Sequence, residues 1–548
     1  MMQNSFNKII NFCLKYGIKI IAIIVGIIGI LSIFISAYFQ TTFYHPDEKT
    51  FFKYSIGIVE ILVTIFVFAL IALISRKILK KIPSKILIVL LLIASSILFI
   101  FWVKTLKLNP ETDQKMIHDM ALYFLDGNIS HHLETAQYLF FYPYQFGLTF
   151  FVSLIYKFFG TDYMNILLVN CICSTINIFI LFYLSKLIFK NENIQKILIF
   201  LLGGFSLLWM FFNPHFYGNI IGLTLALASV LFTTFYLDNK KHINLVLSGI
   251  FIALSIIIKT NYQIFLCGIV LVLLFDIIKK WNIKNLVLVI LTFIIGYAGI
   301  NLGYSQIQKI SNVELPEGIP MISFIYMGMD EPTVLSPGWY NGVTVDIFKD
   351  NSYNVAASKE ESKQLILERL SYFFNNPNEA LSYYTEKIGS TWLNPTFQTI
   401  WCSLPGTRYR WYPEYAHYLG YHETLLSMVG GDLYKIEEFM FEIYQILIFI
   451  FASIGIYRIS NSANAKQSLL LIIFAGGFLF HIIWETKSIY VIQYYFLLLP
   501  FAAYGINFII EKLTKLNLKK KNKQKQKDLL ESNLEGLNLS TISFHHIV

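Results

Sequence analysis

The run Ile18–Phe39, IKIIAIIVGIIGILSIFISAYF, decides the fold class. It is long enough to cross a bilayer, which takes about 20 apolar residues. It is too long for the apolar region of a signal peptide, and no small-residue cleavage site follows it, so we expect a first transmembrane helix. Similar runs predict about twelve spans in all, the others at residues 54–75, 85–103, 163–188, 196–212, 219–237, 243–258, 262–279, 285–304, 437–458, 467–484 and 489–510.

The composition agrees with an all-α polytopic membrane protein. Of the 548 residues, 56% are hydrophobic and 14% are charged, whereas soluble domains are about 25% charged. This excludes a soluble enzyme, a disordered protein and a disulfide scaffold. The net charge of +9 is no sign of nucleic-acid binding, because most of the excess lies in short loops and a basic tail. The five cysteines suggest no disulfide or zinc site.

Lysine and arginine predict the orientation, since they favour cytoplasmic loops. Arg76, Lys77, Lys80, Lys81 and Lys85 crowd one loop without an acid. For this loop and the other basic loops to share one side, residues 140–158 cannot span and should form a juxtamembrane helix on the outer face. Both termini are then cytoplasmic, and the Lys-rich bias of the chain suggests a bacterial plasma membrane.

Four regions follow from this topology. We expect a transmembrane core at 1–304 that includes an external loop at 104–162. An external cap of helical and irregular segments should occupy 305–436, followed by the last spans at 437–510. The basic tail 511–548 is expected to be cytoplasmic and disordered.

The first polar motif follows an outward-running span at residues 109–127, NPETDQKMIHDMALYFLDG. Pro110 ends one helix, Thr112 or Asp113 can cap the next, and Gly127 closes it. Asp113 should therefore lie at a helix N-terminus on the membrane surface, where the helix dipole keeps it ionised. A plain N-cap is an equally good structural interpretation.

This motif resembles the first external loop of the GT-C superfamily of membrane glycosyltransferases, including protein O-mannosyltransferases and the lipid A aminoarabinose transferase. The resemblance implies Asp113 as a catalytic base, with Glu111 beside it, and His118 and Gln145 as sugar or acceptor ligands. Residues 142–148, YPYQFGL, resemble the juxtamembrane helix of the family. Residues 45–48, HPDE, are a second, weaker version of the acidic motif.

Two more polar loops should reach the same face. His215 and Tyr217, in the loop NPHFYGN at 213–219, could bind a sugar, although a turn with interfacial aromatics gives the same pattern. Lys259 lies between two apolar runs, where a cation is costly unless it reaches water or an anion. The resemblance implies that it binds a polyprenyl phosphate; snorkelling is the alternative.

The last polar loop, WETKSIY at 484–490, resembles a motif of bacterial members of the group, with Ile489 where arginine is usual. Lys487 and Tyr490 could bind phosphate and Glu485 could orient the ligand, or Glu485 and Lys487 could form an interhelical ion pair. In the cap, Arg408 and Arg410 could be further phosphate ligands, and Trp339 could stack on a sugar or belong to an interfacial belt.

Together these residues predict a membrane glycosyltransferase of the GT-C type. It should move a sugar from a polyprenyl-monophosphate donor to an external hydroxyl of a glycan, lipid or protein, with inversion and without a metal or other cofactor. The alternatives are a glycan polymerase or ligase with a lipid-diphosphate donor and, less favoured, a lipid-linked sugar flippase. A flippase would favour paired intramembrane charges and an inverted repeat, and the sequence has neither.

Overall fold

The computed structural model of the chain describes residues 2–39, 50–78, 81–280, 283–331, 335–402, 423–430 and 432–542. The all-α polytopic fold class is confirmed. Within these ranges, ten helical stretches are long and apolar enough to cross a membrane. They comprise α1 (Met2–Phe34), α2 (Ile58–Leu73), α3 (Ser84–Leu106), α7 (Tyr163–Phe189), α8 (Glu192–Phe212), α9 (Asn219–Asn239), α11 (Gln263–Lys280), α21 (Asp432–Ile459), α22 (Ala465–Ile483), and α23 (Ile492–Phe496) with α24 (Leu499–Ile542).

The two remaining predicted spans are also helical. α10 (His242–Ile258) is apolar but has only 17 residues, and α12 (Ile283–Ser311) has 29. The first predicted span ends earlier than expected, because residues Ile35–Phe39 form a strand, β1, that pairs with β2 (Thr50–Tyr54). The Ala37 amide donates to Leu393 at 3.0 Å, which fastens this hairpin to a distant part of the chain.

The apolar stretch at 140–158 is broken into short pieces, in agreement with its expected juxtamembrane position. It contains α5 (Tyr138–Phe141), a 3-10 turn at Pro143–Gln145 and α6 (Phe146–Phe159), which has 14 residues. Gly160, with φ of +93°, ends α6, and the Asp162 carboxylate then accepts the Met164 amide at the start of α7. A helix of 14 residues is about 21 Å long, too short for a bilayer core of about 30 Å.

Close helix packing brings the last spans together. A Cβ at Gly505 would overlap the Phe451 carbonyl oxygen, and a Cβ at Gly455 would overlap that of Phe501. The two glycines therefore let the backbones of α21 and α24 touch, as small residues do between membrane helices.

The basic loops gather at one end of the bundle. Lys466 pairs with Asp238 at 2.7 Å and donates to the Leu187 carbonyl at 2.9 Å. Arg76 donates to the Ile510 carbonyl at 2.8 Å. The Lys466 bonds join the ends of α7 and α9 to the start of α22, and the Arg76 bond joins the turn after α2 to α24. Loops far apart in sequence therefore share one end of the bundle.

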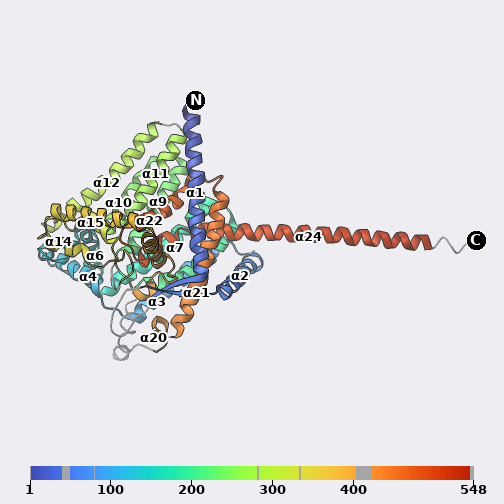
Figure 1. Cartoon of the computed structure of the whole chain (residues 1–548), viewed down its shortest axis with the longest axis horizontal. Coiled ribbons are helices and arrows are strands. Elements are labelled where there is room, and N and C mark those ends of the chain that lie inside the picture. Colours follow the sequence, from blue (N-terminus) through green and yellow to red (C-terminus); the bar gives the residue numbers. More distant parts are fainter. Residues whose placement is uncertain are drawn as a thin grey trace, which may run out of the picture.

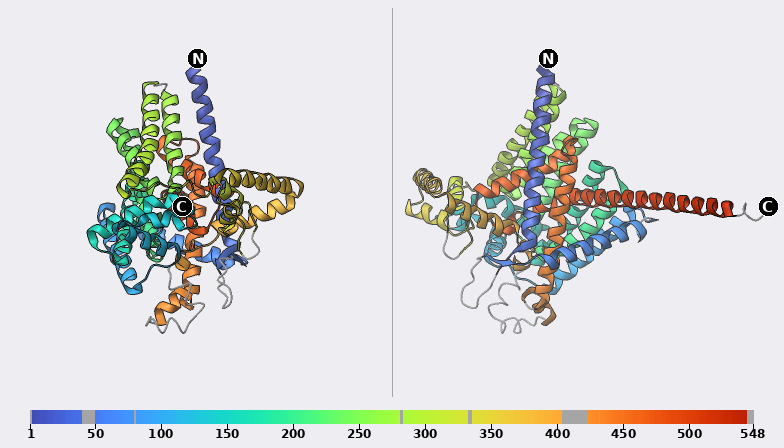
Figure 2. Two further views of the ribbon diagram at one scale, coloured as in Figure 1. Left: turned by 90° about the vertical axis from the view of Figure 1, so that its left-hand side faces the viewer. Right: turned by 45° about the vertical axis from the view of Figure 1, so that its right-hand side comes forward.

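The segment between α12 and α20 (Glu423–Gly430) contains α13 (Met321–Met327), α14 (Val343–Asp350), α15 (Val355–Asn375), α16 (Pro377–Trp392) and α17 (Thr399–Cys402). Its helices form small apolar cores of their own, one of which includes Phe324, Met327, Phe348 and also Phe141 of α5. We refer to residues 321–392 as the α13–α16 segment; it lies on one side of the bundle (Figures 1 and 2).

The tail differs from the disordered extension expected from residue 511. α24 continues as one helix to Ile542 and projects far from the bundle (Figure 1). Residues 511–542 include eight lysines and eight leucines, which favour helix, and no proline. Helix propensity, carried on from a packed span, therefore replaces the disorder that the charge alone suggested.

Candidate active site

A cavity of about 320 Å³ lies where the loops at the other end of the bundle converge. Its walls come from the start of α4 (Thr112–Leu125), the α5–α6 region, the loops before α9 and α11, the α13–α16 segment and the loop after α22. The lining residues are Asp113, Tyr138, Tyr142, Tyr144, Gln145, Tyr217, Ile258, Lys259, Thr260, Asn261, Gln263, Ile264, Met321, Phe324, Tyr340, Phe480, Trp484, Glu485, Lys487 and Tyr490.

Asp113 lies in the first turn of α4, as the sequence predicts, and faces this cavity. The N-cap residue is Glu111, in place of Thr112 or Asp113, and its side chain makes no capping hydrogen bond. Asp113 is solvent-exposed, and the free amides of the first turn favour its negative charge. The carboxylate is therefore available to a ligand, whereas Glu111 is not among the lining residues.

A chain of polar side chains forms the wall beside Asp113. The Tyr138 and Tyr217 hydroxyls are 2.8 Å apart, and the Gln145 amide donates to the Tyr217 hydroxyl at 2.7 Å. Burial raises the pKa of both phenols well above the ordinary value, so both remain neutral. Neutral hydroxyls and an amide at fixed spacing can bind sugar hydroxyls.

Lys259 is held over the ring of Tyr217. Its ammonium nitrogen lies 4.0 Å from the ring centroid and donates to the Tyr217 carbonyl at 3.3 Å. Burial lowers the pKa of Lys259 to about 7, although the carboxylates of Asp113 and Glu485 act in the opposite direction. A cation in this desolvated position gains from an anionic ligand.

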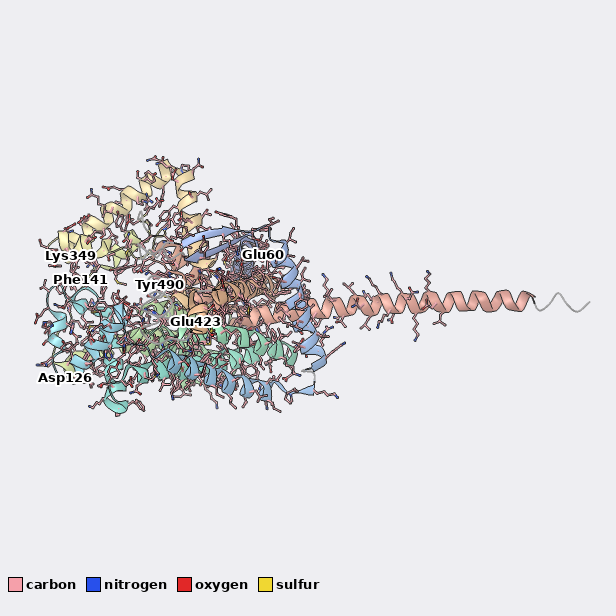
Figure 3. The ribbon with its side chains drawn as sticks, turned by 90° about the horizontal axis from the view of Figure 1, so that it is seen from below. Glu60, Asp126, Phe141, Lys349, Glu423 and Tyr490 are labelled. Carbon is pink, nitrogen blue, oxygen red and sulfur yellow. The ribbon has the colours of Figure 1, made fainter. Side chains whose placement is uncertain are left out.

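The loop from Trp484 to Tyr490 supplies the opposite wall. The Tyr490 hydroxyl lies 3.4 Å from Glu485 Oε1, and Lys487 Nζ lies 5.9 Å from the ring centroid of Trp339. Burial raises the pKa of Glu485 to about 7, against the effect of Lys487 and Lys259. Figure 3 places Tyr490 toward the middle of the molecule, whereas Asp126 and Lys349 lie at its periphery. Two lysines and a protonatable carboxyl thus face one cavity.

This loop is fastened to the α13–α16 segment by Lys387. The Lys387 side chain is 1% exposed, and its ammonium donates to the carbonyls of Gly328, Ile482 (2.9 Å) and Trp484 (2.9 Å). The Thr486 amide donates to the Gly338 carbonyl at 2.9 Å. A Cβ at Gly328 would overlap the Ile483 carbonyl oxygen, so glycine is required for this close approach.

Three predicted site residues lie beside the cavity and not in its wall. His118 packs between Tyr156, whose hydroxyl is its hydrogen-bond partner, and Tyr163. Trp339 is fully buried beneath Lys487. His215 stacks on Phe212. Arg408, Arg410 and residues 45–48 lie outside the described residues.

His215 belongs to a network that fixes its own loop. Gln114 Nε2 lies 3.3 Å from His215 Nδ1, while Gln114 Oε1 accepts from the Tyr163 hydroxyl at 2.6 Å and from the Phe216 amide at 3.3 Å. Burial, assisted by Lys259 and Lys487, lowers the pKa of His215 to about 3, so the ring is neutral. A neutral, stacked imidazole suits positioning better than phosphate binding.

Several lining residues belong to none of the predicted site residues. Tyr138, Tyr142, Tyr144 and Tyr340 line the cavity, with the Tyr142 and Tyr340 hydroxyls 2.8 Å apart. The dense aromatics of residues 138–144 were the available signal, but interfacial belts have the same composition. Among the described residues, no group of three or more His, Cys, Asp or Glu side chains could hold a metal ion.

The comparison with protein families bears on the walls of this cavity. Residues 142–298 match the family model described as dolichyl-phosphate-mannose-protein mannosyltransferase, part of the GT-C superfamily. The matched segment is similar to that of GT-C membrane glycosyltransferases. It carries Gln145, Tyr217 and Lys259 of the cavity, and covers less than a third of the chain. The resemblance seen in the sequence is thereby confirmed. A comparison with curated proteins gives no match.

Proposed function

We propose that the protein transfers a sugar from a polyprenyl-monophosphate donor to an acceptor hydroxyl at the outer face of a bacterial plasma membrane. The observation that carries this proposal is the single cavity that unites a carboxylate at a helix N-terminus, Asp113, with two cations, Lys259 and Lys487. The family match supports a glycosyltransferase with a lipid-linked donor of this kind.

Each group would have a defined part in the reaction. The acceptor oxygen attacks C1 of the sugar, the bond from C1 to the phosphate oxygen breaks, and Asp113 accepts the proton of the hydroxyl. Lys259 and Lys487 stabilise the negative charge of the departing lipid phosphate, and Tyr490 supports Glu485 beside them. Gln145 and Tyr217 would hold the sugar. A single displacement inverts the anomeric centre and needs no metal.

The arrangement of the loops supports a site on the outer face. The basic loops, which include Lys466 beside Asp238 and Arg76 beside Ile510, lie at the end of the bundle opposite the cavity. Positive charge favours the cytoplasmic side, so the cavity would face outward and both termini inward.

The deciding experiment compares Asp113→Asn with Asp119→Asn. Asp119 is on the same helix but pairs with Lys115 and does not line the cavity. The purified variants are incubated with polyprenyl-phosphate mannose and an envelope extract, and release of the lipid phosphate is measured. Asp113→Asn should keep its thermal unfolding temperature and lose at least about 100-fold in rate. Full activity of this variant would refute the proposal.

The two cations are also compatible with a diphosphate donor, which the polymerase or ligase alternative requires. Parallel assays with lipid-monophosphate and lipid-diphosphate sugars separate the two. Turnover of the monophosphate alone supports the proposal, and turnover of the diphosphate alone favours the alternative.

A further inference from the structure

A second groove lies near the basic end of the bundle, where three spans meet. It has a volume of about 420 Å³ and is lined by Ala22 and Ile23 of α1, Ser453, Ile454, Tyr457 and Arg458 of α21, and Phe508 and Lys512 of α24. Arg458 is in the last turn of α21, and Lys512 lies two residues beyond Ile510, whose carbonyl accepts Arg76 of a basic loop. The groove is therefore separate from the candidate active site.

Its shape follows from how the three helices pack. The Ser453 hydroxyl donates to the Ala22 carbonyl at 2.7 Å, which holds α1 against α21. The contact at Gly455 and Gly505 holds α24 against the other side of α21. α1 and α24 then leave the bundle in different directions, as Figures 1 and 2 show. The groove lies in the fork between them.

The groove is apolar in its interior and cationic around it. Ile23 and Tyr457 are each 55% exposed. The guanidinium of Arg458 lies 4.4 Å from the ring centroid of Phe508, and Lys19 Nζ lies 5.8 Å from that of Tyr457. No carboxylate of the described residues forms an ion pair with Arg458 or Lys512. Arg458 and Lys19 thus lie beside aromatic rings, and the charges of Arg458 and Lys512 are not neutralised by an ion pair within the described part of the chain.

We propose that this groove binds an anionic phospholipid of the cytoplasmic leaflet. Its phosphate would lie between Arg458 and Lys512, with Lys19 nearby, and one acyl chain would cover Ile23 and Ile454. A guanidinium matches phosphate geometry and keeps its charge at every physiological pH. The adjoining apolar surface favours a lipid over a free anion, because a small ion leaves that surface uncovered.

The test measures lipid binding alone and does not depend on catalysis. The purified chain in neutral detergent is mixed with phosphatidylglycerol or phosphatidylcholine, and bound lipid is counted by native mass spectrometry. The variant Arg458→Gln/Lys512→Gln removes both cations of the groove. The control, Lys519→Gln/Lys523→Gln, removes the same charge from exposed positions of α24 beyond it. Size-exclusion profiles confirm that each variant is folded.

Each cation near an anionic lipid contributes about fivefold in binding. The groove variant should therefore bind phosphatidylglycerol about 25-fold more weakly, and the control should bind like the original chain. Equal binding of phosphatidylcholine, equal loss in the control, or displacement of the lipid by millimolar inorganic phosphate would overturn the proposal. If the groove variant does not fold, the single variant Lys512→Gln, at an exposed position, repeats the test, and its binding of phosphatidylglycerol should be about fivefold weaker.

Discussion

The ammonium of Lys387 lies 2.9 Å from the carbonyl oxygen of Trp484, 97 residues further along the chain. This contact joins α16 to the loop that carries Glu485 and Lys487. The same ammonium also reaches the carbonyls of Gly328 and Ile482. One buried lysine thus ties the α13–α16 segment to one wall of the cavity, which makes that segment part of the site.

Lys387→Met should impair donor binding more than the chemical step. The partly buried carbonyls of Ile482 and Trp484 lose this donor, at a cost of about 1–3 kcal/mol for each one that is left unsatisfied, whereas the Gly328 carbonyl keeps the Tyr383 hydroxyl. The loop that holds Lys487 also loses its anchor. We expect KM for the lipid-linked donor to rise at least about tenfold with a smaller change in kcat. Steady-state kinetics measure both.

The matched control for this change is Lys363→Met. Lys363 lies on α15, is exposed and pairs only with Glu360 among the described residues. The Lys363→Met variant should keep the original KM for the donor and the original unfolding temperature. An unchanged KM in Lys387→Met would show that the loop keeps its position without this anchor.

The low pKa of Lys259 predicts a pH dependence of donor binding. Its pKa is lowered to about 7, so the cation that attracts the phosphate is present below this pH and disappears above it. The donor Kd should therefore rise by about 50-fold between pH 7 and pH 9 if this single group controls binding. Lys259→Arg stays protonated over this range.

Titration of both proteins with polyprenyl phosphate between pH 6 and pH 9 checks this prediction. The original chain should show the rise, and Lys259→Arg should give a nearly flat profile in the same range. The same rise in Lys259→Arg would assign the titration to another group.

Much of the site could be predicted because its polar residues interrupt apolar runs. Asp113, Lys259 and Lys487 each follow a span that ends at the same side, so the alternation of spans alone brings them to one end of the bundle. Lys387 could not be predicted, because its burial depends on the close approach of Gly328 to Ile483. Likewise, only packing shows that His118 and Trp339 lie behind the cavity wall.

Gln114→Leu should destabilise the fold without removing a ligand of the cavity. It leaves the Tyr163 hydroxyl and the Phe216 amide without their acceptor, at about 1–3 kcal/mol for each buried group. We expect a lower unfolding temperature, measured by thermal denaturation in detergent. Gln364→Leu, at a solvent-exposed position that pairs with Glu368, is the control. Equal unfolding temperatures of the two variants would contradict the role given to Gln114.

The topology can be tested with single cysteines in a variant that lacks the five natural ones. Glu134 is exposed near the cavity, and Glu379 is exposed on α16. Lys241 is exposed between α9 and α10. A membrane-impermeant maleimide should label Glu134→Cys and Glu379→Cys in intact cells, and Lys241→Cys only after lysis. This outcome is expected because lysine and arginine in short loops favour the cytoplasmic side. Labelling of Lys241→Cys in intact cells, with Glu379→Cys protected, would place the cavity on the cytoplasmic side and exclude an external acceptor.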